Sequence, residues 1–251
     1  MSAILSIRNV TMKFGDLAAN EDVSFDINNN EIVSLIGPNG AGKTTLFNCI
    51  TGYYAPFSGR ITYSGADGKT CDITARPPDK ISRLGIARTF QIVKTLNDMT
   101  AEQNIMTGAF LHTSSTAGAR KEAARVMELT GLLQKKDVPG RNLTIVDRKM
   151  VEIARALAIR PKLLMLDECM AGLNQTEIRN IMRLVLDLKA QGLTLLVVEH
   201  IMEAIMPISD RIVVLSAGKK IAEGAPQMIA ENDEVIKAYL GEKYHAKTHQ
   251  H

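Results

Sequence analysis

The fold of this chain is decided by the stretch Gly37-Pro38-Asn39-Gly40-Ala41-Gly42-Lys43-Thr44-Thr45. It matches the pattern G-x-x-x-x-G-K-[ST], in which glycines let backbone N–H groups approach phosphate oxygens. The run 31–36, rich in β-branched residues and Leu, predicts a strand before this loop, and residues 43–52 predict a helix whose positive dipole end faces it. This order of elements predicts a phosphate-binding loop. We therefore expect Lys43 to reach the β- and γ-phosphates of ATP, and Thr44 to ligate Mg²⁺.

The composition is that of an ordinary globular protein. Hydrophobic residues make up 45% and charged residues 23% of the 251 residues, which is enough for one large domain or two small ones. The net charge of +3, without a dense Lys/Arg block, disfavours nucleic-acid binding. Cys49, Cys71 and Cys169 lack C-x-x-C spacing, which is typical of a reducing compartment. We expect no signal peptide, and no run approaches the ~18 apolar residues of a membrane helix, so a membrane role requires a partner.

Strands and helices alternate along most of the chain, which predicts an α/β fold with a mainly parallel sheet covered by helices. Between residues 91 and 140 the pattern becomes mostly helical and interrupts this alternation. We expect strands at 4–14, 23–27, 31–36, 61–63, 163–166, 193–198 and 212–215, and helices at 43–52, 101–111, 119–133 and 176–190, with a further helix capped by Thr144 and running to 158.

Polar residues follow two of the later strands. Asp167 and Glu168 come directly after the apolar run 163–166, and His200 follows the run 193–198. The ends of such strands face the crevice where ligands bind, so Asp167 is a candidate Mg²⁺ ligand and Glu168 a candidate base for the attacking water. His200 would lie beside the same γ-phosphate. Taken alone, a capped strand and a packed histidine are the alternatives.

The order of these motifs resembles the nucleotide-binding subunit of an ABC transporter, over nearly the whole chain. The resemblance implies a P-loop NTPase (RecA-like) core with a mainly parallel sheet, an N-terminal antiparallel β subdomain and a helical insert subdomain. It implies a single ATP-binding domain over 1–251. The expected parts are a core formed by 1–90 and 160–240 with the antiparallel subdomain, a helical signature subdomain at 91–159, and a tail at 241–251.

The resemblance also assigns a role to each matching position. Phe14 would stack on adenine, although a core or rim aromatic is the alternative, and residues 171–174 would form the D-loop. The implied catalytic residues are Glu168, His200 as the switch histidine and Gln91 of the Q-loop. The implied nucleotide-binding residues are Phe14, residues 37–45 and, for the ATP of a partner subunit, Thr144. The implied Mg²⁺ ligands are Thr44, Gln91 and Asp167.

Two further segments, 83–91 and 235–242, are similar to LivG-type subunits, which serve importers of branched-chain and other hydrophobic amino acids or amides. This implies ATP and Mg²⁺ as cofactors and a dimer of ATP-binding subunits, either with a second copy or with a LivF-type partner. It further implies membrane-spanning permease subunits and, indirectly, an extracytoplasmic binding protein. The expected location is cytoplasmic, on the inner face of the cell membrane.

The signature segment departs from the family. Family members begin it with Leu-Ser, then glycines, then Gln, whereas this chain has Leu143-Thr144-Ile145-Val146-Asp147. Thr144 retains a hydroxyl for one phosphate contact, Val146 replaces a glycine, and Asp147 adds negative charge near the partner's ATP. Cys169 and Gln175 also stand where proline is common. We therefore hypothesise an asymmetric heterodimer in which the ATP site that uses residues 144–147 is the weaker one.

Three other functions match parts of the same pattern. Soluble ABC-type ATPases of DNA repair or translation usually carry long coiled-coil inserts or tandem cassettes, which this chain lacks. A nucleotide-binding regulator with little hydrolysis is disfavoured by Glu168 and His200, and a P-loop kinase by the missing second-substrate site. The sequence leaves open the cargo, the choice between homodimer and heterodimer, and whether the tail histidines (245, 249 and 251) bind metal or belong to a frayed terminus.

Overall fold

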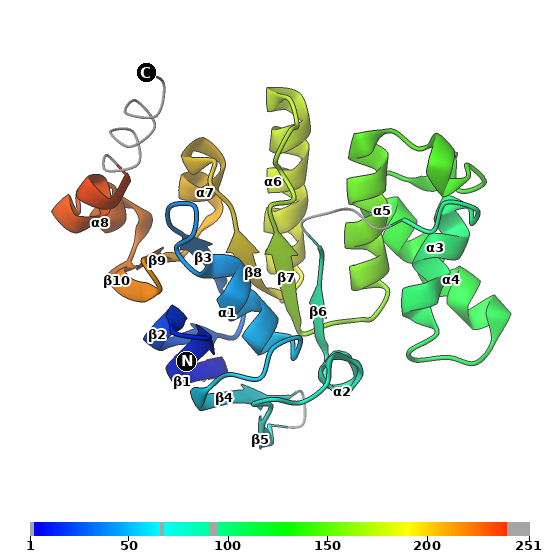
Figure 1. Ribbon diagram of the computed structural model, residues 1–251. Coiled ribbons are helices and arrows are strands. Elements are labelled where there is room, and N and C mark those ends of the chain that lie inside the picture. Colours follow the sequence, from blue (N-terminus) through cyan, green and yellow to red (C-terminus); the bar gives the residue numbers. More distant parts are fainter. Residues whose placement is uncertain (1–2, 66–67, 91–94, 240–251) are drawn as a thin grey trace. The chain divides into compact units, whose positions relative to one another are not determined.

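The computed structural model describes residues 3–65, 68–90 and 95–239. By its internal contacts the chain divides into two compact units, one formed by Met1–Pro78 with Leu196–His251 and one by Asp79–Leu195 (Figure 1). We call them unit 1 and unit 2. The predicted helical subdomain, 91–159, falls inside unit 2. No helix in the described ranges is long and apolar enough to cross a membrane.

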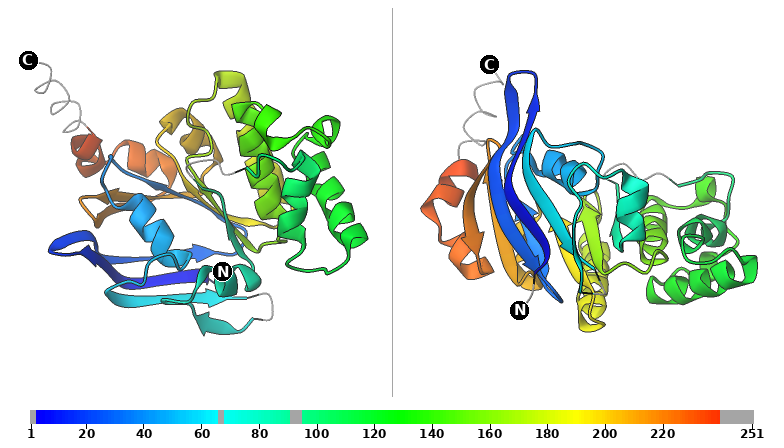
Figure 2. Two further views of the ribbon diagram at one scale, coloured as in Figure 1. Left: turned by 45° about the vertical axis from the view of Figure 1, so that its right-hand side comes forward. Right: turned by 90° about the horizontal axis from the view of Figure 1, so that it is seen from below.

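Unit 1 contains an antiparallel sheet with the strand order β2-β1-β4-β5. Ile7 on β1 lies opposite Phe25 on one side and Ile61 on the other, and all three are buried. The first two strands form one long, twisted hairpin (dark blue in Figure 2), which confirms the antiparallel part of the predicted fold. The bounds are β1 Ala3–Phe14, β2 Leu17–Asn28, β4 Ser58–Ser64 and β5 Thr70–Asp72.

The strand predicted at 23–27 begins six residues earlier, at Leu17. Residues 17–22 lack apolar alternation, because most of them are exposed or half-buried. They form a strand because the turn at Gly15, with φ +60°, returns the chain along β1 and pairs Phe14 with Leu17. Cross-strand pairing thus extends β2 beyond its apolar residues.

The second sheet of unit 1 carries the phosphate-binding loop. β3 runs parallel to β9, with Leu35 opposite Val213, and β9 pairs antiparallel with β10. The sequence did not predict β10, since half of its residues are charged and it pairs at the sheet edge. The strands are β3 Ile32–Ile36, β9 Arg211–Ser216 and β10 Lys219–Gly224, and the helices are α1 Lys43–Ile50, α7 Met202–Ile208, α8 Pro226–Ala230 and a helical segment at 233–239.

Unit 2 contains a parallel strand pair, in which Ala87 of β6 lies opposite Leu164 of β7. β8 is shared between the units, its first two residues belonging to unit 2 and its last three to unit 1. The elements are α2 Pro78–Arg83, β6 Ile86–Arg88, β7 Leu163–Asp167, α6 Gln175–Ala190 and β8 Thr194–Val198.

The helical part of unit 2 packs α3 against both α4 and α5. α4 begins three residues earlier than predicted because the Ser115 hydroxyl accepts a hydrogen bond from Gly118 N–H and caps the helix. It ends earlier because Gly131, at φ +70°, turns the chain away. The bounds are α3 Ala101–Ala109, α4 Thr116–Leu129 and α5 Ile145–Leu157, with short 3₁₀ turns at Leu133–Lys135 and Gly140–Asn142.

Candidate nucleotide site

The phosphate-binding loop lies between the fully buried β3 and helix α1, as the sequence predicts. Gly42 is the N-cap of α1 at φ +94°, and Gly40 also has positive φ, at +76°. These conformations favour glycine, and successive N–H groups in turns of this kind form anion-binding concavities. A Cβ on Gly42 would lie 2.2 Å from the Ala19 carbonyl oxygen, so a side chain there cannot be accommodated without a backbone shift. The loop therefore has the geometry of an anion cradle at a helix N-terminus.

A residue of β2 and one of the turn between β9 and β10 hold this loop by hydrogen bonds. The buried Asn20 of β2 donates from Nδ2 to the Gly42 carbonyl at 3.1 Å, and Gly218 N–H donates to the Ala41 carbonyl at 3.2 Å. Asn20 was not predicted as a site residue, because a single asparagine in a polar strand carries no recognisable pattern. These bonds fix the loop before any ligand arrives, which lowers the entropy lost on binding.

Lys43 and Thr44 occupy the first turn of α1. The Lys43 ammonium is mostly buried and donates to the carbonyl oxygens of Gly37 at 2.6 Å and Pro38 at 2.8 Å. The loop thus holds its own cation in place with carbonyl groups. Thr44 is exposed, so its hydroxyl is accessible to a ligand at the loop.

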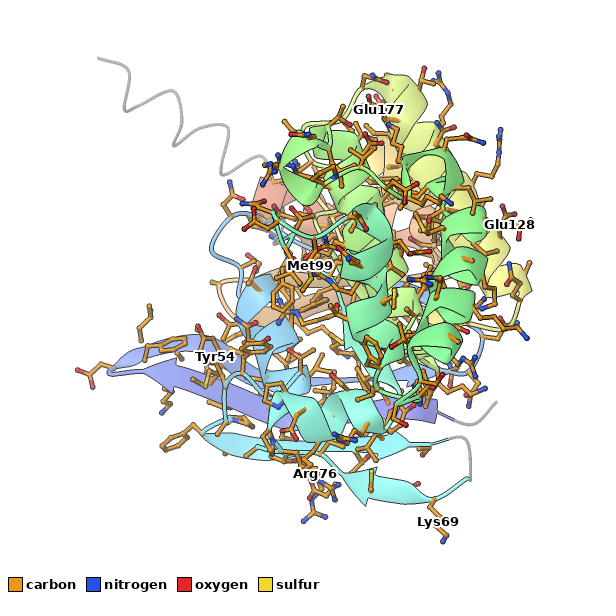
Figure 3. The ribbon with its side chains drawn as sticks, turned by 90° about the vertical axis from the view of Figure 1, so that its right-hand side faces the viewer. Tyr54, Lys69, Arg76, Met99, Glu128 and Glu177 are labelled. Atoms are coloured by element: carbon orange, nitrogen blue, oxygen red, sulfur yellow. The ribbon has the colours of Figure 1, made fainter. Side chains whose placement is uncertain are left out.

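Phe14 is the last residue of β1, and its side chain is 46% exposed. The ring of Tyr54, which Figure 3 labels, meets it edge-to-face, with the centroids 5.3 Å apart and the planes at 81°. Such contacts orient aromatic rings and add about 0.5–1.5 kcal/mol beyond the area that they bury. Phe14 therefore presents an oriented aromatic surface in unit 1. No sequence pattern indicates Tyr54 as a site residue, because only the folded chain brings it next to Phe14.

His200 follows β8 and is also in unit 1. Its side chain is 54% exposed, and Nδ1 lies 3.9 Å from Oε2 of the fully buried Glu199. This distance is an ion-pair approach rather than a hydrogen bond. The histidine is therefore open to a ligand and is not a packed core residue, which was the alternative.

In unit 2 the buried strand β7 ends at Asp167, whose side chain is inaccessible to solvent. Thr89 aligns this strand end: its N–H donates to the Met165 carbonyl at 2.9 Å, and its hydroxyl accepts from Asp167 N–H at 3.0 Å. Arg88 Nη2 lies 3.5 Å from Asp167 Oδ2, so a cation faces the carboxylate. Neither Arg88 nor Thr89 was predicted as a site residue, since the short strand β6 that carries Arg88 has no periodicity.

Glu168 comes directly after β7 and has left-handed backbone geometry, with φ +48°. This conformation costs a non-glycine residue about 1–2 kcal/mol, so surrounding contacts have to hold it. The ammonium of Lys149 on α5 donates to the carbonyl oxygen of Glu168 at 3.3 Å. The candidate base is thus on a strained, braced turn, which is a common arrangement at functional sites.

The altered signature segment is a self-capped helix start. The Thr144 hydroxyl accepts from Asp147 N–H at 3.2 Å and donates to Asp147 Oδ2 at 2.7 Å. Lys135 Nζ lies 2.6 and 2.5 Å from the two oxygens of Asp147. Burial alone would raise the pKa of Asp147. The hydrogen bonds from Lys135 and Thr144 nevertheless hold this pKa below its ordinary value.

This geometry changes the expectations for both residues. The negative charge of Asp147 is compensated by Lys135 within the same chain, and the Thr144 hydroxyl is engaged by its own helix. Ile145 beside them is 70% exposed. The segment therefore presents an apolar side chain at a helix start whose polar groups are paired locally.

The remaining predicted positions fall into two groups. Asn174, the last residue of the predicted D-loop, is the N-cap of α6 and forms a capping box with Glu177, which Figure 3 labels. Gln91 and the three tail histidines lie outside the described residues. The loop and His200 belong to unit 1, and Asp167, Glu168 and Thr144 to unit 2, so each half of the predicted site is described by itself.

Comparison with known proteins agrees with these motifs. Residues 20–171 match the family model for ABC transporters, and residues 219–245 match that for the branched-chain amino acid ATP-binding cassette transporter. The LivG protein of Salmonella typhimurium, a high-affinity branched-chain amino acid transport ATP-binding protein, is 40% identical over 95% of this chain and 98% of its own length. The corresponding BraF protein of Pseudomonas aeruginosa is 39% identical over the same shares.

Solved structures support the same assignment. A nucleotide-free ATP-binding cassette from an ABC transporter superposes with a TM-score of 0.85 at 30% identity, covering 95% of this chain and 99% of the other. The ADP conformation of an ATP-binding cassette gives the same TM-score at 31% identity, over 96% and 100% of the two chains. The P-loop NTPase fold expected from the sequence is confirmed. This chain belongs to the ABC transporter family as one of its ATP-binding cassettes, a nucleotide-binding ATPase.

Proposed function

We propose that this chain energises an importer of branched-chain amino acids or related hydrophobic amino acids and amides. The observation that carries the proposal is the phosphate-binding loop on a chain whose residues 219–245 match the branched-chain transporter segment. The resemblance to LivG and BraF supports the cargo class. The partners would be membrane-spanning permease subunits, a second ATP-binding subunit of LivF type, and indirectly an extracytoplasmic binding protein. The chain would then lie on the inner face of the cell membrane.

In this proposal the residues of the loop bind the triphosphate. Lys43 would turn from the Gly37 and Pro38 carbonyls to the β- and γ-phosphates, and Phe14 would stack on adenine. Glu168 would polarise the attacking water, with Gln91 and His200 contacting the γ-phosphate region. Closure of the dimer around ATP and its reopening after hydrolysis would drive the permease.

Mg²⁺ fits the residues of this chain. In the described ranges no group of three or more His, Cys, Asp or Glu could hold a metal. A nucleotide-bound Mg²⁺ requires only one or two protein ligands, because phosphates and water complete its shell. The exposed Thr44 hydroxyl and the buried Asp167 carboxylate are ligands of the required type, and Gln91 is the third candidate. When bound, the ion would neutralise charge on the β- and γ-phosphates.

Transport assays test the cargo class. In cells lacking the gene for this chain, uptake of labelled leucine, isoleucine or valine should be lost. Wild-type protein should restore it and the Lys43→Met variant should not. Co-purification of integral membrane subunits would support the transporter assembly. A chain that hydrolyses ATP but never associates with membrane subunits would favour the soluble-ATPase alternative.

The Phe14→Ala variant tests the adenine contact. We expect ATP affinity to fall about tenfold, because stacking of a base on an aromatic side chain contributes roughly 1–3 kcal/mol. Phe14→Trp should retain the affinity. Leu17→Ala is the matched control, since Leu17 pairs with Phe14 across the hairpin and is 70% exposed. Competition by tripolyphosphate, which has no base, should be unchanged in all three variants; a parallel loss of tripolyphosphate binding would indicate damage to the loop.

The altered signature is the basis of the proposed asymmetric heterodimer. One hydrogen bond to a charged group is worth about 1.5–3 kcal/mol, and Val146 would cost one such bond from the helix start to the partner's ATP. Val146→Gly should therefore raise ATP affinity at that site about tenfold and increase the ATPase rate of the assembled transporter. Ala117→Gly serves as the control for glycine in a first helical turn, because Ala117 is the exposed second residue of α4, as Val146 is the second residue of α5. An unchanged ATPase rate of Val146→Gly would contradict the hypothesis.

A further inference from the structure

Lys149 is a charged residue on the buried side of α5, five residues after Thr144. Its side chain is only 8% exposed. The ammonium donates to three carbonyl oxygens of one turn, those of Glu168 at 3.3 Å, Cys169 at 3.1 Å and Ala171 at 2.7 Å. An ammonium has three donors, so a single side chain serves three backbone acceptors.

These carbonyls belong to the turn 168–171, which follows β7 and leads into the predicted D-loop. Within the turn Ala171 N–H donates to the Glu168 carbonyl at 3.3 Å, and Leu173 N–H donates to the Met170 carbonyl at 3.3 Å. Charge-assisted bonds are about twice as strong as neutral ones. Lys149 therefore ties α5 by three charge-assisted bonds to a turn whose first residue is in a strained left-handed conformation.

One turn further along α5, Glu152 makes a parallel contact. Its carboxylate accepts from Phe90 N–H at 3.1 Å, and Phe90 directly precedes Gln91. Burial raises the pKa of Glu152 to about 6, against the opposing influence of this N–H and of Arg155, Lys149 and Arg88. The same face of α5 thus contacts the turn that carries Glu168 and the residue before Gln91, and all of these belong to unit 2.

We propose that Lys149 is a positioning residue for ATP hydrolysis, which holds the Glu168 carboxylate in its working direction by tying the turn 168–171 to α5. A misplacement of about 1 Å can cost roughly a hundredfold in rate, so the brace matters for turnover more than for binding. The inference rests on the proposed role of Glu168. This role gives α5 a function within its own chain. That function does not depend on how well the first residues of α5 contact the ATP of a partner subunit.

A double-mutant cycle on the assembled transporter tests this inference. Lys149→Met keeps the length and removes the donors; we expect single-turnover hydrolysis to slow about 10- to 100-fold with ATP affinity unchanged. Lys149→Arg, which keeps a positive charge and donors, should recover most of the rate. Lys121→Met is the control, because Lys121 is exposed on α4. In the Glu168→Gln background, Lys149→Met should slow hydrolysis no further.

The possible results separate the two claims. If Glu168→Gln slows hydrolysis and Lys149→Met does not, the brace is overturned and the role of Glu168 stands. If the two effects multiply, Lys149 acts by another route, which also overturns the inference. A Lys149→Met variant that loses rate and ATP affinity together would show a general structural role instead. If Glu168→Gln is itself as fast as wild type, the proposed base and the inference both fall.

Discussion

Glu168→Gln should lower ATP hydrolysis by the assembled transporter at least about 100-fold while leaving ATP affinity within about twofold. The amide keeps the size of the side chain but cannot accept a proton from water, and a positioned general base contributes roughly 10²- to 10⁴-fold to a rate. The phosphate-binding loop is in the other unit and is not altered, so binding should persist. Single-turnover hydrolysis and nucleotide titration on the same preparation measure both quantities.

The control for this variant is Glu128→Gln. Glu128 is an exposed residue of α4, and Figure 3 labels it. It should hydrolyse ATP at the wild-type rate. A Glu168→Gln transporter that retained more than a third of the wild-type rate would assign the general base to another group.

Lys43→Met should lower ATP affinity by about 100-fold or more and abolish transport. The ammonium is the only side-chain cation in the loop 37–45, and each charge-assisted bond to a phosphate is worth about 1.5–3 kcal/mol. Two such bonds correspond to a factor of at least about 100. Calorimetric titration with ATP measures the loss directly.

Lys43 also holds the Gly37 and Pro38 carbonyls, so its removal has a structural side effect. Thermal unfolding of the variant, compared with that of Lys80→Met on α2, separates a loosened loop from a lost phosphate contact. A Lys43→Met protein with a wild-type melting temperature and ATP affinity within threefold would exclude the proposed phosphate contact.

Elements with strong apolar periodicity were predicted well. The run before the phosphate-binding loop, the strand ending at Asp167 and the helix capped by Thr144 lie within one or two residues of their predicted positions. Short or charged elements, such as β6 and β10, were not predicted. Their strand geometry comes from pairing with a neighbour, Arg88 with Met165 and Glu223 with Val213, and not from their own side chains.

The environment of the signature segment was only partly predictable from its own residues. Loss of the glycine at position 146 is visible in the sequence, and so is the helix cap at Thr144. The charge on Asp147 was expected to act on a partner's ATP, yet Lys135, twelve residues earlier, pairs with it. A charge on one element is neutralised by a charge on another only once the chain has folded. The net charge at such a position therefore cannot be derived from the segment alone.

By itself the sequence determined that this chain contains a phosphate-binding loop between a strand and a helix. The reason is local: glycines, a lysine and a hydroxyl at fixed spacing specify that loop's backbone and charge. Only the tertiary structure decided what holds the site in place, namely Asn20 behind the loop, Tyr54 against Phe14 and Lys149 beneath the Glu168 turn. These contacts join residues between 19 and 40 positions apart, and such pairs leave no spacing pattern in one sequence.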